Sequence, residues 1–88
     1  MIHIVHLIPT LTPGGALRSL AACARECSRL EAFRHTAVGL SPCPSSDQGR
    51  AVLREDGVEP LEAPNRDVLN GLLAGADLVV VHFWNDPG

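Results

Sequence analysis

Two glycines and a histidine occupy positions where ligand chemistry is expected. Gly14 and Gly15 lie between an apolar run over 2–8 and a helical pattern. A helix that starts without Cβ atoms leaves its first N–H groups accessible, and these groups and the helix dipole favour anions or strong hydrogen-bond acceptors. His82 ends a second apolar run. An imidazole there can donate a hydrogen bond to a ligand oxygen or take part in proton transfer.

Each of these residues also has a purely structural interpretation. A strand-to-helix turn that needs a positive φ selects glycine with or without a ligand, which applies to Gly14 and Gly15. His82 can instead pack in the core. Trp84 offers a broad apolar plane for a sugar face, or it can cover the end of the sheet.

The usual nucleotide and metal motifs are missing. The glycines do not form GxGxxG, no acidic residue stands in segment 40–42 where a ribose-binding acid would follow the second strand, and no Gly-Lys-Ser/Thr occurs. Without an Asp-x-Asp pair, a divalent metal is not implied. Cys23 and Cys27 are one helical turn apart but have no further zinc-ligand motif, which favours packing. Cys43 has no nearby histidine or basic cluster in the sequence to activate its thiol.

Short apolar runs alternate with helical periods, which is typical of β-α units around a parallel sheet. We expect strands over 2–8, 36–40, 58–61 and 78–81, and helices over 16–30, from 46 or 47 to Gly57, and from a cap at Asn65 or Asp67. The expected buried faces are Leu17, Leu20, Ala21, Ala24 and Cys27 or Ser28 in the first helix, and Val68, Leu69, Leu72 and Leu73 in the third. His3 and His6 are expected to be packed in the first strand, and His35 to sit at a helix-to-strand turn.

Right-handed crossovers predict an α/β, Rossmann-like half-domain whose four parallel strands have the order 3-2-1-4, with flanking helices. The first and fourth strands then lie side by side. Their carboxyl ends bring the Gly14–Gly15 loop and segment 82–85 to one edge of the sheet, where ligands of open α/β sheets bind.

Size and composition limit the classes of protein further. The chain has 88 residues, 45% hydrophobic, so it forms one domain or part of one. A net charge of −3 argues against nucleic acid or an anionic membrane as partner. No apolar run approaches the roughly 20 residues of a membrane span. With three cysteines and no signal-peptide pattern, reduced thiols in the cytoplasm are expected.

The fourth expected strand, 78–81, is apolar on both faces and would be an exposed edge. Natural proteins rarely leave such an edge unpaired. We therefore expect that further polypeptide or another chain covers it, which allows self-association or a partner chain at this strand.

The segments PTLTPGGALRSL and DLVVVHFWN together resemble the start of a GT-B glycosyltransferase of the retaining group that uses nucleotide-diphospho-sugars. The resemblance implies that Gly14 and Gly15 approach the donor phosphates and the acceptor, and that Arg18 is the arginine that follows this loop. It places the residues after the fourth strand, His82, Trp84 and Asn85, at the acceptor side of the interdomain cleft. Leu17 departs from the acidic residue usual in that family.

The resemblance spans about half of the family's N-terminal domain, so residues 1–88 would be its N-terminal part without the C-terminal donor domain. It implies no cofactor, only a nucleotide-diphospho-sugar as donor substrate, and no sugar transfer by this segment alone. The alternative hypothesis is a non-catalytic α/β binding or assembly module that dimerises or docks through the fourth strand. A flavodoxin-like phosphate or FMN binder is a third hypothesis.

Overall fold

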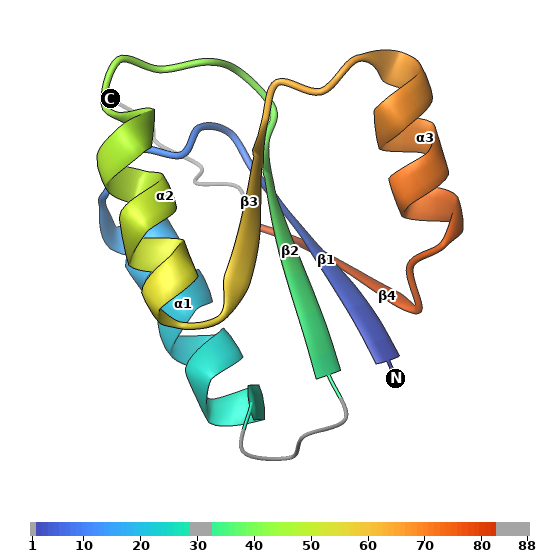
Figure 1. Ribbon diagram of the computed structural model, residues 1–88, viewed down its shortest axis with the longest axis horizontal. Helices are drawn as coiled ribbons and strands as arrows, with labels where there is room; N and C mark the ends of the chain where they lie inside the picture. Colours follow the sequence, from blue (N-terminus) through green and yellow to red (C-terminus); the bar gives the residue numbers. More distant parts are fainter. Residues whose placement is uncertain (1, 29–32, 83–88) are drawn as a thin grey trace.

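The computed structural model describes residues 2–28 and 33–82, which form four strands and three helices in strict alternation (Figure 1). The strands are β1 (Ile2–Ile8), β2 (Phe33–Gly39), β3 (Val58–Glu62) and β4 (Leu78–Val81), and the helices are α1 (Gly15–Ser28), α2 (Ser46–Glu55) and α3 (Arg66–Ala74). The four strands are parallel and have the order β3-β2-β1-β4. This confirms the predicted α/β fold and its strand order.

The helices cover the two faces of the sheet unequally, with α1 and α2 on one face and α3 on the other (Figure 1). The main core lies between the sheet and the α1–α2 layer. Its buried members are Ile8, Leu11, Leu17, Leu20, Ala21, Ala24, Ala37, Leu53 and Val58. The predicted buried face of α1 is therefore confirmed from Leu17 to Ala24. Cys23, for which packing was predicted, is exposed, because it lies off this face of the helix.

The apolar stripe predicted for α3 is only partly covered. No residue of α3 is buried, and the side chain of Val68 is 49% exposed. Within the described residues α3 is the one helix on its face of the sheet, so no second helix packs beside it. The predicted cap is confirmed at Asn65, whose Oδ1 accepts the N–H of Val68 at 2.9 Å.

The second strand begins earlier than its apolar pattern predicts. β2 pairs with β1 along its whole length, from Ile2 opposite Phe33 to Ile8 opposite Gly39. The long neighbour extends β2 toward its amino end, because ladder hydrogen bonds outweigh the weak local pattern there. His35 consequently lies inside the strand and is buried, which corrects its predicted place at a turn.

β4 forms one edge of the sheet and pairs with β1 from Ile4 opposite Leu78 to Leu7 opposite Val81. Three of its four side chains are well exposed, with fractions of 53% for Leu78, 40% for Val79 and 51% for Val81. β3, which contains Pro60, forms the opposite edge as predicted. Of the helices described, none combines the length and the apolar composition needed to cross a membrane.

Candidate functional site

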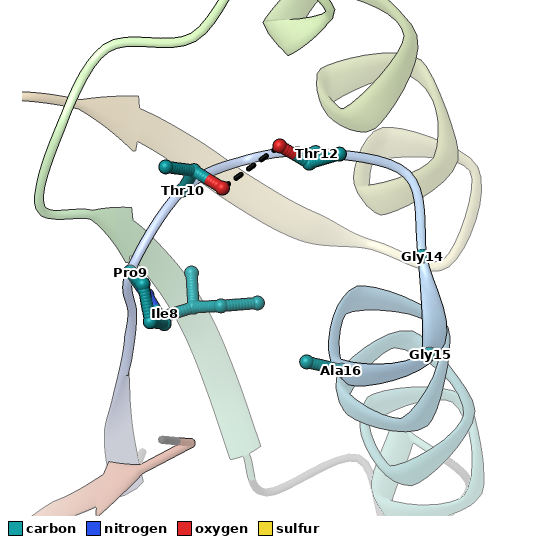
Figure 2. A pocket seen from close by; sticks show the side chains of 7 residues that line it. All are labelled: Ile8, Pro9, Thr10, Thr12, Gly14, Gly15 and Ala16. Atoms are coloured by element: carbon teal, nitrogen blue, oxygen red, sulfur yellow. Dashed lines mark hydrogen bonds between the residues drawn. The ribbon is translucent and has the colours of Figure 1, made fainter. Parts of the chain in front are cut away.

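A cavity of about 310 Å³ lies at the carboxyl end of β1, in the loop that leads into α1 (Figure 2). Its lining residues are Ile8, Pro9, Thr10, Thr12, Gly14, Gly15 and Ala16. The carbonyl of Gly14 accepts the N–H of Arg18 at 3.0 Å, so the first turn of α1 starts at the wall of the cavity. The first N–H groups of a helix have no acceptor within the helix, and this first turn contains no acidic residue. The opening is therefore suited to an anion or to hydroxyl oxygens.

The two glycines of this loop are not required by its backbone conformation. Among the described glycines, only Gly57 has a positive φ, so neither Gly14 nor Gly15 uses the freedom that distinguishes glycine. A Cβ atom placed on Gly14 would meet only the Thr12 carbonyl oxygen, at 4.0 Å. The conformation of the turn therefore does not explain why glycine occupies these two positions. Because Gly14 has no side chain, the start of α1 is open to the cavity.

Thr10 and Thr12 add hydroxyl groups that the sequence reasoning did not single out. Their Oγ1 atoms are 2.8 Å apart, and both residues line the cavity (Figure 2). Leu11, between them, is fully buried and belongs to the core. The alternation of threonine, leucine and threonine is the sequence signal that could have revealed them, because a buried middle residue turns its two neighbours outward.

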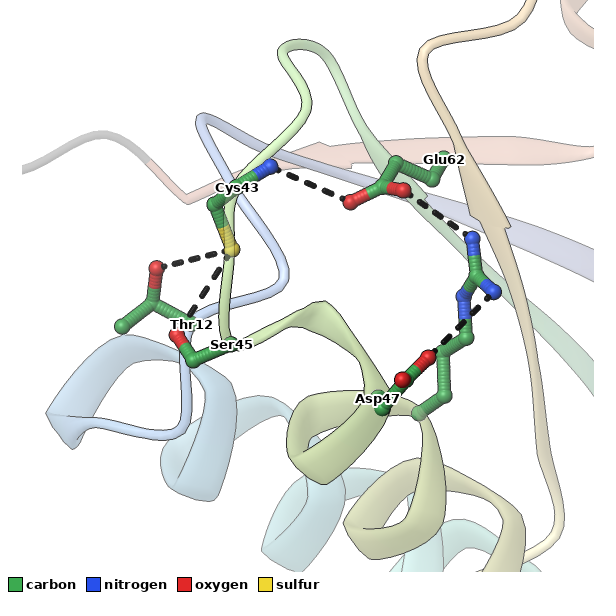
Figure 3. A network of polar contacts seen from close by, with 6 residues as sticks. Thr12, Cys43, Ser45, Asp47 and Glu62 are labelled. Carbon is green, nitrogen blue, oxygen red and sulfur yellow. Dashed lines mark hydrogen bonds and ion pairs between the residues drawn. The ribbon is translucent and has the colours of Figure 1, made fainter.

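A second loop, between β2 and α2, is held against the cavity loop by Cys43 (Figure 3). The Thr12 hydroxyl donates to Cys43 Sγ at 3.3 Å, and the Cys43 N–H donates to Glu62 Oε2 at 3.3 Å. Glu62 in turn accepts from Arg50 at 3.0 Å. The hydrogen bond from Thr12 lowers the pKa of the Cys43 thiol, aided by Ser45 and opposed by burial and by Glu62. Hydroxyl donors thus stabilise the thiolate where no cation was found in the sequence.

His82 continues the β4 ladder by donating its backbone N–H to the Leu7 carbonyl at 2.8 Å. Its half-buried ring does not line the cavity but faces His6, with Nε2 2.9 Å from His6 Nδ1. His6 Nε2 is in turn 2.9 Å from Nδ1 of His35. His6 and His35 are only 1% and 3% exposed, so the predicted packing of His6 is confirmed. The contacts join β1, β2 and the residue that follows β4 in one row of imidazoles, which the sequence reasoning missed.

The environment of this row favours neutral rings. Burial, and to a smaller extent the neighbouring His82 and His35, lower the pKa of His6 from 6.5 to about 4. Burial also lowers the pKa of His35, with a smaller effect from His3, and burial lowers the pKa of His82. The three imidazoles are therefore uncharged at neutral pH.

The remaining predicted site residues are placed less directly. Arg18 is exposed on the first turn of α1 and is not among the residues that line the cavity. Trp84 and Asn85 lie outside the described residues, so their roles stay predictions. His3, on the same strand as His6, pairs instead with Thr36, at 2.8 Å between Nε2 and Oγ1. Within 2–28 and 33–82, no three histidine, cysteine or acidic residues cluster in a way that could hold a metal ion.

We compared the chain with family models, curated proteins and solved structures, and none of them matches it. The comparisons assign no family. The features of this chain that bear on its function are the cavity, the histidine row and the two sequence segments that carry the resemblance.

Proposed function

We propose that this chain is the N-terminal, acceptor-side segment of a GT-B glycosyltransferase, which transfers a sugar from a nucleotide-diphospho-sugar to an acceptor. The observation that carries the proposal is the cavity at the carboxyl end of β1, into which α1 opens through Gly14 and Gly15. It lies at the carboxyl end of β1, which pairs with β4, and this edge is the usual ligand position of an open parallel sheet. The segment alone is inactive in this proposal, because a donor domain must supply the nucleotide site.

The chemistry of the site fits the charge that develops during sugar transfer. When the bond between the sugar and the diphosphate of the donor breaks, negative charge grows on the departing diphosphate. The N–H groups at the start of α1 are preorganised donors for those oxygens. The hydroxyl hydrogen of Thr12 is used on Cys43 Sγ and that of Thr10 on Thr12, so the two threonines shape the cavity wall without adding free donors. His82 is hydrogen-bonded to β1, the strand that leads into the cavity. The resemblance assigns His82 to the acceptor side of the cleft. The free thiols of Cys23, Cys27 and Cys43 agree with a cytoplasmic location, which is part of the proposal.

Gly14→Asp tests the anion role of the helix start. Aspartate is a favourable N-cap residue and the space beside Gly14 is open, so the fold should be retained. Its carboxylate, however, would occupy the first N–H groups of α1 and repel a phosphate. We expect uridine diphosphate to shift the amide resonances of residues 14–17 in the wild-type chain, and the variant to bind it at least tenfold more weakly.

Gly14→Asn is the matched control, because it caps the helix with the same shape and no charge. It should keep most of the affinity in the same NMR titration. Equal affinity of Gly14→Asp and the wild-type chain would contradict the proposal, as would resonance shifts located away from this loop.

A second candidate function is a non-catalytic module that assembles through β4. The observation that favours it is the exposure of Leu78, Val79 and Val81 on an edge strand. Unpaired N–H and C=O groups beside apolar side chains form a template for a further strand. A second copy of the chain is the simplest occupant, since two identical edges can pair about a two-fold axis.

Leu78→Lys tests this candidate. Leu78 is 53% exposed, so a lysine there is tolerated by the monomer but charges the edge. If the chain assembles through β4, light scattering after size exclusion should show a dimer for the wild type and a monomer for the variant. Val68→Lys introduces the same charge at a 49% exposed position of α3 and should leave the dimer intact. A wild-type chain that is monomeric at high concentration would eliminate the candidate.

A further inference from the structure

The row His82–His6–His35 runs from the residue after β4 across β1 to β2, on one face of the sheet. Ring centroids are 5.1 Å apart in both neighbouring pairs, with ring planes inclined by 34° and 22°. Both nitrogen-to-nitrogen distances are 2.9 Å, the length of a normal hydrogen bond. The row therefore consists of two consecutive imidazole–imidazole hydrogen bonds.

Neutral imidazoles can satisfy this row in only two ways. Each ring has one N–H donor and one lone-pair acceptor, and both nitrogens of His6 are engaged. If His6 donates to His82, it must accept from His35. If His6 accepts from His82, it must donate to His35. Both hydrogen bonds thus run in the same direction, either toward His82 or toward His35.

The buried end of the row decides between these directions. Nε2 of His35 is buried and has no hydrogen-bond partner among the described residues. With both bonds directed toward His35, this nitrogen carries a hydrogen that nothing accepts. With both directed toward His82, it keeps only an unused lone pair. Orphaned buried N–H groups are the rarer of the two, and at the other end of the row Nδ1 of His82 is not a buried nitrogen without a partner.

We propose that His35 donates to His6 and His6 to His82, so that His82 is held with its proton on Nδ1. The two ring nitrogens lie across the imidazole from each other, so this N–H is directed away from His6. His82 then acts as a neutral donor toward a ligand oxygen, either a sugar hydroxyl or a phosphate oxygen, and not as the resting-state base. His6 is a positioning residue that acts through His82. The tautomer follows from the hydrogen bonds alone, and its use on a ligand rests on the proposed function.

Long-range ¹H–¹⁵N correlation of the ligand-free, ¹⁵N-labelled chain at pH 7 reads each tautomer directly, because protonated and unprotonated ring nitrogens resonate far apart. We expect a protonated Nδ1 and an unprotonated Nε2 on His82, His6 and His35. A protonated Nε2 on His82 or His35, or one averaged pattern for His82, would overturn the proposal without any ligand being added.

Two variants and two probes complete the test. His6→Leu should release His82 into an averaged pattern, whereas His3→Leu, on the same strand but bonded to Thr36, should leave His82 unchanged. Methyl glucoside or inorganic phosphate should then move the Nδ1–H resonance of wild-type His82, and whichever probe does so identifies the source of the oxygen. If neither moves it, the ligand assignment is wrong even where uridine diphosphate binds at Gly14.

Discussion

Gly49→Ala is expected to lower the free energy of unfolding by about 3 kcal/mol, despite alanine's preference for helices. Gly49 is buried inside α2, and an added Cβ would overlap the carbonyl oxygen of Leu11. It would also approach Leu17 Cδ1 to 3.0 Å. The obstacle is backbone and core, not the end of a flexible side chain, so α2 and the cavity loop must separate. Chemical denaturation followed by circular dichroism measures the change.

Gly71→Ala provides a matched control in another helix. Gly71 lies within α3, and a Cβ there meets nothing within 4 Å. The same substitution should therefore stabilise the chain by about 0.5–1 kcal/mol, through helix propensity and a less flexible unfolded state. Similar effects of the two substitutions would show that α2 does not pack on Leu11 as described.

The contact at Gly49 also bears on the site. Leu11 stands between Thr10 and Thr12, whose hydroxyls line the cavity. A displaced Leu11 carbonyl moves both threonines, so any Gly49→Ala protein that still folds should bind uridine diphosphate more weakly. Gly71→Ala should bind it like the wild-type chain.

Acidification from pH 6.5 to 4 is expected to remove on the order of 3 kcal/mol of stability through His6 alone. The pKa of His6 is lowered from 6.5 to about 4 in the folded chain. Between these values the unfolded chain binds a proton at this residue and the folded chain does not. The free energy of unfolding therefore rises with pH across this window and reaches its full value above pH 6.5. The lowered pKa values of His35 and His82 act in the same direction.

Denaturation at a series of pH values between 4 and 7 measures this dependence, and His6→Leu isolates the share of His6. The variant loses hydrogen bonds and should be less stable at pH 7, but its stability should fall less steeply toward pH 4. An identical slope in the variant and the wild type would mean that His6 is protonated as easily in the folded chain as in the unfolded one.

Much of the fold follows from local pattern. The ranges of β1 and β4 agree with the prediction residue by residue, because each is a compact apolar run between residues that interrupt a strand. The buried face of α1 follows from helical spacing. Gly57 ends α2 with φ of 78°, as its identity indicates. The strand order needs only these elements and right-handed crossovers.

Other features depend on neighbours that are remote in the chain. The amino end of β2 is extended by β1, and the α3 stripe is half exposed because no further described element covers it. That Gly14 has no positive φ and borders open space could not be read from the sequence, because glycine fits a tight turn and an open helix start equally well.

The element types, their order in the sheet and the edge at which Gly14 and His82 lie could be predicted, because these features follow from local periodicity and chain handedness. The contacts of His82 could not. His82 and His6 are 76 residues apart in the chain, and His6 and His35 are 29 apart. Their rings meet because parallel pairing sets the register of β4 and β2 on β1, and that register is a property of the assembled sheet.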